Sequence, residues 1–340
     1  MGEFDLIKRF FTRPTPHAVL GVGDDCALLQ PSIGMHMAIS TDMLVSGRHF
    51  FPDVDPRALG HKSLAVNLSD LAACGAKPVA FTLALALPEA DAAWLEPFSQ
   101  GLLALADLHG CELIGGDTTQ GPLNICITVF GEVPRGQALL RSGAQAGDDI
   151  YVSGTLGDAN LALTQLLHER QDIAGSPAVA LDAPDLAQAR QRLEWPTPRV
   201  ALGLALRGIA TAAADISDGL LGDLGHILER SGTGATLNAD TAFGLLGAHH
   251  YSDAATRLLA NPALRQTVLR HVLSGGDDYE LVFTAPVHQR AAVQAAALTS
   301  HTPVQRIGQI EALPGLRLHD AQGRLLNLDF HAFDHFAAAA

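Results

Sequence analysis

DPRALGHKSLAVNLSDLAACG, residues 55–75, has the pattern of one complete helix with both of its ends marked. Asp55 can accept hydrogen bonds from the free N–H groups of the first turn, and Pro56 is preset for that turn. Gly75 suits the cap after the last turn, because glycine adopts the left-handed backbone there without strain. We therefore predict a helix that begins after Asp55 and ends before Gly75.

The predicted helix has two different faces. Three leucines recur at helical spacing on one face, which we expect to pack in a core. Asp70 falls with Asn67 and Ser63 on another face, at the spacings that bring helical side chains together. This second face is polar, so it is a candidate for function.

Strands are predicted on both sides of this helix, and the alternation continues along the chain. The expected order is strand, helix, strand, helix, strand, strand, at residues 37–42, 55–75, 79–87, 91–109, 111–117 and 123–133. This order indicates one mixed α/β (α+β) domain, because strands and helices alternate and the last two strands follow each other directly.

A second domain is predicted because 340 residues exceed what one core usually serves. The Gly-rich stretch LLRSGAQAGDDIYVSG contains the boundary, which gives domains at 1–146 and 147–340. The second domain contains a turn and helix at 154–167, a polar Pro-containing insertion near 170–185 and a helix at 196–210. It continues with a strand at 211–215, a helix at 217–232 and strands at 279–286, 304–310 and 316–320.

Composition excludes several classes of function. The formal net charge is −14 and no basic run occurs, so nucleic acid and anionic membranes are not expected partners. No apolar run reaches the roughly 18 residues that span a bilayer, and the first residues lack a signal-peptide pattern. The four cysteines have no C-x-x-C spacing and are expected in a reducing, cytoplasmic environment.

Paired aspartates in GVGDDCALL, residues 21–29, suggest a site for cations. Two like charges about 4 Å apart repel by roughly 4 kcal/mol at an effective dielectric of about 20. A turn in water tolerates this, but further aspartates recur beside Gly, Ser or Thr at predicted strand ends, at 42, 117 and 215. Carboxylates and hydroxyls are ligands for hard divalent cations such as Mg²⁺, which also bind substrate phosphates.

The common nucleotide-binding motifs do not occur in this sequence. Lysine is present only at 8, 62 and 77, so no Gly-Lys pair of a P-loop exists, and the kinase motifs H-R-D and D-F-G are missing. The turn and helix GTLGDANLALTQLL could offer backbone N–H groups to a phosphate. Arg141, in RSG, is a candidate phosphate contact, although a solvated arginine at a boundary would look the same.

Seven stretches taken together resemble the thiamine-monophosphate kinase family. They are GDDCALL, ISTDMLVSGRHF, AVNLSDLAACGAKP, LIGGDTTQGP, RSGAQAGD, DISDGLLGDLGHI and SGGDDYEL, and their order and spacing carry the resemblance over nearly the whole chain. The superfamily also includes aminoimidazole ribonucleotide synthetase, selenophosphate synthetase and a hydrogenase-maturation enzyme.

The resemblance implies a role for individual residues. The implied metal ligands are Asp25, Ser40, Thr41, Asp42, Asp70, Asp117, Asp215 and Asp218. The implied ATP contacts are Gly116, Asp117, Arg141 and Ser217. The implied contacts to thiamine monophosphate are His49, Asp277 and Phe333. The chain departs from the family pattern at Asp277, where Glu is more familiar, and at Phe333, where the ring is often Tyr or Trp.

The resemblance also implies a fold, a partner and a reaction. The N-terminal domain is expected to be ferredoxin-like and to pair in a homodimer through a joint β-barrel, followed by a C-terminal α/β sandwich. The reaction is phosphorylation of thiamine monophosphate to thiamine diphosphate by ATP with several Mg²⁺ ions. A direct in-line transfer needs positioning and charge neutralisation rather than a catalytic base, so no catalytic residue is assigned.

Two alternatives share some of these features. Another ATP-dependent synthetase of the superfamily would use the same aspartates, but the selenium and hydrogenase branches suggest a catalytic Cys near one end. Here the first cysteine, Cys26, lies inside the aspartate motif. A non-catalytic divalent-cation-binding module would bind calcium without turning over ATP, and the sequence lacks an EF-hand loop.

Overall fold

The computed structural model describes residues 2–326 and divides the chain into two compact units. The first unit comprises Met1–Ala138 and the second Leu139–Ala340. The sequence placed the boundary at 146, within the stretch that opens the second unit. Each unit is described by itself below.

The first unit contains three α-helices and four strands in the described part of the chain. They are α1 (Glu3–Leu6), β1 (Met35–Val45), α2 (Pro56–Ala73), β2 (Lys77–Leu87), α3 (Ala92–His109), β3 (Glu112–Gln120) and β4 (Asn124–Pro134). The order from β1 to β4 confirms the predicted alternation. Asp55 caps α2 as predicted and accepts hydrogen bonds from the N–H groups of Arg57 at 2.7 Å and Ala58 at 3.3 Å.

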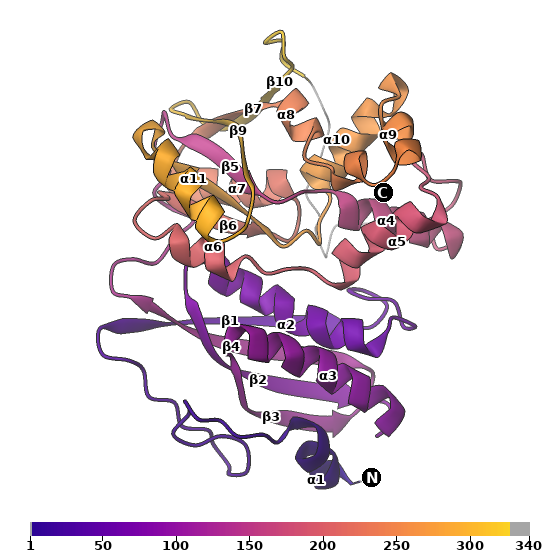
Figure 1. Ribbon diagram of the computed structural model, residues 1–340, viewed down its shortest axis with the longest axis vertical. Helices are drawn as coiled ribbons and strands as arrows, with labels where there is room; N and C mark the ends of the chain where they lie inside the picture. The colour runs from indigo at the N-terminus through magenta and orange to yellow at the C-terminus, as the bar shows by residue number, and fades with distance from the viewer. Residues whose placement is uncertain (1, 327–340) are drawn as a thin grey trace. The chain divides into compact units, whose positions relative to one another are not determined.

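The four strands form one mixed sheet in the order β1-β4-β2-β3. Only β2 and β3 are parallel, whereas β4 runs antiparallel to both β1 and β2. The long helices α2 and α3 contact each other and cover one face of the sheet (Figure 1). Alternate residues of β4, such as Ile125, Ile127 and Val129, are buried beneath them.

The helices α2 and α3 meet at two glycines. A Cβ on Gly60 would lie 2.0 Å from the carbonyl oxygen of Phe98, and a Cβ on Gly101 would lie 1.9 Å from that of Arg57. No side chain can occupy that space, so these glycines set how closely the two helices approach. The close approach in turn fixes α2 against the sheet.

The other face of the sheet is largely uncovered within this unit. On β1, Ile39 and Met43 are 61% and 55% exposed, and Thr41 between them is exposed as well. Side chains alternate between the faces of a strand, so these three share one face while Ser40 and Asp42 share the face toward α2. The unit therefore presents an open sheet face with apolar side chains on it.

The second unit is a mixed sheet with helices. Its helices are α4 (Asp158–Glu169), α5 (Ala183–Glu194), α6 (Val200–Ala205), α7 (Leu220–Ser231), α8 (Ala239–Phe243), α9 (Asp253–Leu259), α10 (Arg265–Ser274) and α11 (Arg290–Thr299). Its strands are β5 (Asp149–Ser153), β6 (Ala212–Ile216), β7 (Gly234–Asn238), β8 (Glu280–Ala285), β9 (Val304–Glu311) and β10 (Gly315–His319).

The six strands lie in the order β10-β7-β9-β5-β8-β6, and only β10 and β7 are parallel. Ile150 and Val152 of β5 belong to the core that also contains buried residues of α4, α7 and α10. Tyr151 points to the opposite face and stacks on Phe283 of β8, with ring centroids 5.3 Å apart. The predicted mixed α/β class is confirmed for both units.

Two elements of the second unit differ from the sequence-based expectation. The helix expected at 196–210 is only Val200–Ala205, because a residue that precedes a proline disfavours the helical backbone and Pro196 and Pro198 stand at its start. The helix α5 was not predicted after the polar insertion. Its start signal is nevertheless present, since Asp182 accepts a hydrogen bond from the N–H of Asp185 at 3.1 Å.

Across residues 2–326, none of the helices combines the length and the apolar character that a membrane span requires.

The glycine contact between α2 and α3 makes a testable prediction. Replacing a helical glycine by alanine usually stabilises a protein by up to about 1 kcal/mol. Gly101→Ala should instead destabilise by about 1–3 kcal/mol, because its new methyl group collides with the backbone of α2. Gly225→Ala is the matched control, since Gly225 lies inside α7 with open space at its Cβ position. Urea unfolding of both variants measures the two effects, and a Gly101→Ala protein as stable as the control contradicts the prediction.

Candidate functional site

Oxygen atoms from β1 and α2 meet on the covered face of the first sheet. The Ser40 hydroxyl donates a hydrogen bond to Oδ2 of Asp70 at 2.5 Å. The Asp42 N–H donates to Oδ1 of Asn67 at 3.1 Å, so the polar face of α2 lies directly on β1. These residues form one set of side chains whose oxygen atoms are potential metal ligands. We call it the β1–α2 donor set; it comprises Ser40, Asp42, Asn67 and Asp70.

Thr41 does not join this set through its side chain. Its hydroxyl lies on the open face of the sheet and forms a hydrogen bond with the Thr128 hydroxyl of β4 at 2.8 Å. Adjacent residues of a strand point to opposite faces, so the predicted ligands Ser40 and Asp42 flank Thr41 but point away from its hydroxyl.

The two aspartates of GVGDDCALL lie in an exposed turn. The Asp25 N–H donates to Oδ1 of Asp24 at 2.9 Å, and both residues are exposed. Water screens two carboxylates well, so their repulsion costs little in this position. No hydrogen bond joins Asp25 to the β1–α2 donor set in the part of the chain that the structure describes.

Gly116 and Asp117 lie on the other edge of the sheet, on β3. A Cβ on Gly116 would lie 1.8 Å from the carbonyl oxygen of Leu83, and its φ of +144° favours glycine. The strand register places Gly116 in one row with Leu83, Ile127 and Asp42. Three strand spacings, about 14 Å in total, therefore separate Asp42 from the Gly116–Asp117 edge. Within one chain, Asp42 and Asp117 are too far apart to bind one ion together.

His49 lies in the turn that follows β1. The ring Nδ1 of His49 accepts a hydrogen bond from the backbone N–H of Val45 at 3.0 Å. The backbone N–H of His49 donates to the Val45 carbonyl, also at 3.0 Å. The ring is half-buried. The backbone contact fixes the ring at the end of the strand that carries Ser40 and Asp42.

In the second unit, the DISDG stretch lies between β6 and α7. Asp215 is buried near the end of β6, and a buried carboxylate on α7 holds the loop that follows. Oδ2 of Asp223 accepts from the N–H groups of Ser217 at 3.1 Å and Asp218 at 3.2 Å. Burial, and then the charge of Asp218, raise the pKa of Asp223 to about 7, while the positive charge of Arg141 opposes the shift. Arg141 is exposed, and its electrostatic effect associates it with this loop.

The stretch from Gly275 to Glu280 lies beside this loop. The Asp277 N–H donates to the Ser217 carbonyl at 2.9 Å, and the Tyr279 N–H donates to the Ile216 carbonyl at 2.8 Å. The structure thus brings Asp277 to Ser217 and the end of β6, which lie 60 residues before it in the sequence. Phe333, the remaining predicted substrate contact, lies outside the described residues.

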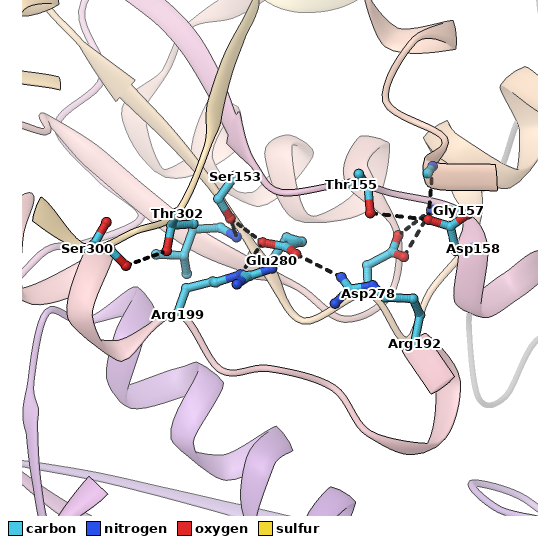
Figure 2. Close-up of polar contacts among 12 residues, drawn as sticks. Ser153, Thr155, Gly157, Asp158, Arg192, Arg199, Asp278, Glu280, Ser300 and Thr302 are labelled. Atoms are coloured by element: carbon cyan, nitrogen blue, oxygen red, sulfur yellow. Dashed lines mark hydrogen bonds and ion pairs between the residues drawn. The ribbon is translucent and has the colours of Figure 1, made fainter. Parts of the chain in front are cut away.

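The start of α4 does not match the expectation of a phosphate site. The Gly157 N–H donates to both carboxylate oxygens of Asp278, each at 3.0 Å, so an acid of this chain occupies that donor (Figure 2). Burial raises the pKa of Asp278 well above its usual range, with Arg192 and the Gly157 hydrogen bond acting against the shift. A phosphate at this position would have to displace a buried carboxyl group.

The oxygen atoms of the β1–α2 donor set fit a magnesium ion whose coordination shell is completed by other ligands. Among residues 2–326, no three His, Cys, Asp or Glu side chains gather into a group that could hold a metal ion. The donors that do meet are carboxylate, hydroxyl and amide oxygens, and Mg²⁺ is usually bound by one or two carboxylates with waters and substrate phosphates. The β1–α2 donor set therefore suits Mg²⁺ that arrives with a phosphate ligand.

Sequence reasoning missed four residues of these sites. Asn67 was placed on the polar face of α2 but given no role, although its spacing of three residues from Asp70 indicated a shared neighbour. Asp223 and Asp278 are buried acids that hold backbone N–H groups, and Arg192 belongs to a helix that was not predicted. No local pattern distinguishes such acids from surface acids, because their partners come from distant parts of the chain.

Two family matches together cover most of the chain. Residues 23–133 match the N-terminal domain of AIR synthase related proteins, and residues 145–321 match the C-terminal domain. The thiamine-monophosphate kinase of Salmonella typhimurium is 46% identical over 99% of this chain and 98% of the relative. That of Bacillus subtilis is 33% identical, with 91% of each chain covered.

Solved structures agree with these matches. The thiamine-monophosphate kinase of Stenotrophomonas maltophilia K279a has a TM-score of 0.78 and 47% identity, covering 93% of this chain and 94% of the other. The complex of AaThiL with AMPPCP and TMP has a TM-score of 0.72 and 28% identity, covering 98% and 96%.

The β1–α2 donor set predicts that Asp70 contributes to divalent-cation binding. Asp70→Asn keeps the side-chain volume but removes one charge, so affinity for Mg²⁺ in the presence of ATP should fall by about tenfold or more. A ligand at 100 times its dissociation constant adds roughly 2.7 kcal/mol of stability, so Mg²⁺ with ATP should raise the melting temperature of the unmodified protein. That rise should be smaller in Asp70→Asn. Asp107→Asn is the control, since Asp107 is exposed on α3 and pairs with Arg13. Equal Mg²⁺ responses in both variants would remove Asp70 from the site.

Proposed function

This chain belongs to the thiamine-monophosphate kinase family, and we propose that it transfers the terminal phosphoryl group of ATP directly to thiamine monophosphate. The product is thiamine diphosphate. The observation that carries the proposal is the 46% identity to named kinases over 99% of the chain. The oxygen donors on β1 and α2 support it, because they suit a metal ion bound to phosphate.

Magnesium is the metal that we propose for the reaction. Asp25, Ser40, Thr41, Asp42, Asp70, Asp117, Asp215 and Asp218 are the residues that would hold the ions. Bound Mg²⁺ supplies neutralisation of phosphate charge. The protein supplies oxygen donors held in place, such as the Asp70 carboxylate fixed by the Ser40 hydroxyl.

The remaining predicted residues would bind the two substrates. Arg141 is an exposed cation suited to a phosphate, and Gly116 beside Asp117 would contact the nucleotide through its backbone. Ser217 would contact the nucleotide from a loop that Asp223 holds. His49, Asp277 and Phe333 would contact thiamine monophosphate, whose positively charged ring suits a carboxylate such as Asp277.

Direct transfer fits the chemistry of the acceptor. The acceptor is a phosphate monoester that is anionic near neutral pH, so it needs alignment rather than deprotonation. The aspartates are assigned to metal binding, and His49 is held by backbone contacts at the end of β1. We therefore assign no covalent intermediate and no catalytic base.

We further propose that two chains pair through the open face of the first sheet. The exposed apolar side chains Ile39 and Met43 lie on that face, and burial of such side chains favours association. The cytoplasmic location stays a prediction from the cysteine pattern.

One assay tests both the activity and the transfer step. Purified protein with ATP and thiamine monophosphate should form thiamine diphosphate with Mg²⁺ and lose activity when the metal is chelated. Double-reciprocal plots for the two substrates should intersect, and γ-chiral ATP should give inversion at phosphorus, because one displacement occurs in a ternary complex. Parallel plots with retained configuration point instead to a phospho-enzyme, with His49 as the first residue to replace. A protein that binds calcium and turns over no ATP would be a cation-binding module.

The dimer is tested by its mass in solution. Light scattering should give twice the 35.7 kDa of one chain. Met43→Glu places a charge on the open face and should shift the mass toward one chain, because burying an unpaired charge is unfavourable. Leu108→Glu is the matched control, since Leu108 is 77% exposed on α3, which covers the opposite face of the sheet. A monomeric unmodified protein, or a Met43→Glu variant that stays dimeric, argues against pairing through this face.

A further inference from the structure

Residues 277–280 alternate between a strained backbone and buried acids. Asp277 and Tyr279 have φ values of +67° and +51°, a left-handed conformation that is unfavourable for residues other than glycine. Only two other non-glycine residues of the described chain have a positive φ, and they lie elsewhere. Asp278 and Glu280, between and after them, are 1% and 0% exposed. Strain of this kind persists only where the surroundings enforce it, and it is often found at functional sites.

Buried charges hold this stretch in place. The Glu280 carboxylate accepts hydrogen bonds from the Ser153 hydroxyl at 2.5 Å, from Arg192 at 2.8 Å and from Nε of Arg199 at 2.6 Å (Figure 2). The Asp278 carboxylate is fixed by the Gly157 N–H on the other side. Both anchors are therefore side chains, and they flank Tyr279. The strained residues Asp277 and Tyr279 donate their backbone N–H groups to the neighbouring loop, and the Tyr279 hydroxyl donates to Oδ1 of Asp277 at 3.3 Å.

Arg192 is the cation that several buried acids share. Burial disfavours its charge, but the charges of Glu280, Asp278 and Asp158 outweigh burial and raise the pKa of Arg192. Asp158 in turn accepts from the Gly247 N–H at 3.0 Å and the Ala248 N–H at 2.8 Å. Removing Arg192 would leave three carboxyl groups in the interior with less positive charge to balance them, and the stretch from Asp278 to Glu280 would lose part of its anchor.

We propose that Arg192, carried by α5, is a positioning residue that holds the strained stretch 277–279 so that Asp277 faces thiamine monophosphate. The inference rests on the proposed function for the identity of the ligand of Asp277. Arg192 itself touches no reacting group and acts through Glu280 and Asp278. Its effect should therefore fall on the binding of one substrate rather than on both.

The matched pair of variants is Arg192→Met and Arg290→Met. Arg290→Met is the control, because Arg290 likewise pairs with a buried carboxylate. The Asp149 carboxylate is fully buried and is held by Arg290 at 2.5 Å and Arg306 at 3.2 Å. Asp149 pairs with Ala285 at the far end of β8, whereas Glu280 begins that strand. Arg192→Met should raise KM for thiamine monophosphate by about tenfold or more and leave KM for ATP within about twofold, since misplacing one contact weakens only its own ligand. Arg290→Met should leave both KM values unchanged.

Conservative replacement and hydrogen exchange separate positioning from folding. Arg192→Lys keeps a charge beside Glu280 and should recover most of the lost affinity. Amide exchange at Asp277 and Tyr279 should be faster in Arg192→Met than in Arg290→Met, with the interior of β8 equally protected. If Arg192→Met does not fold, the same two measurements on Arg192→Gln decide the question, because this variant also removes the charge; it should show faster exchange and a higher KM for thiamine monophosphate than the unmodified protein.

Two results would overturn the proposal. One is a loss of stability in Arg192→Met with both KM values and the exchange of residues 277–279 unchanged, which makes Arg192 only structural. The other is an equal rise of both KM values. Failure of the proposed function has a different signature, since the unmodified protein would then form no thiamine diphosphate while the exchange difference between the variants persists.

Discussion

Acidic side chains that leave water need partners, and this constraint decides how both units are built. In the first unit, the carboxylate of Asp70 is only half-buried and is held by one hydroxyl of β1. In the second unit, Asp158, Asp278 and Glu280 are almost completely buried, and backbone N–H groups and arginines surround them. The half-buried acid is reached by solvent and so by a dissolved cation, whereas the buried acids are balanced by partners inside the protein.

This difference separates acids that can bind a ligand from acids that shape a loop. Asp223 holds two N–H groups of the loop that carries Ser217 and Asp218, and it is not itself a predicted ligand. Asp278 does the same for the start of α4. An acidic sequence motif in this chain therefore mixes two kinds of aspartate, and adjacent residues such as Asp277 and Asp278 belong to different kinds. The buried aspartates that hold backbone N–H groups thus position the aspartates that are predicted to bind ligands.

Much of the fold followed from local patterns, but the sites did so only in part. The ends of α2 were predictable because Asp55, Pro56 and Gly75 affect only the backbone of the adjacent helical turn. The contact of Asp70 with Ser40 depends on how α2 packs on β1, which no local pattern encodes. Thr41 shows the limit most clearly, since the motif groups it with Ser40 and Asp42 while the strand pleat turns its hydroxyl to the other face. The helix α5 was missed because a polar, Pro-containing segment precedes it.

The attachment of α5 has a consequence for how this chain can vary in length. Residues 170–178 include Gly and Pro in a largely exposed, polar stretch, the kind of surface connection in which insertions and deletions are usually tolerated. Val179 and Leu181 after them are buried in the core. The helix at 183–194 follows, and its Arg192 bonds to Glu280 and stabilises the charges of two further buried acids. Shortening the exposed residues before Val179 should therefore be harmless, while removing or rotating the helix that follows would take one arginine from Glu280 and lower the positive charge near Asp278 and Asp158. An exposed surface segment thus leads into a helix that is bonded to the interior of the second unit.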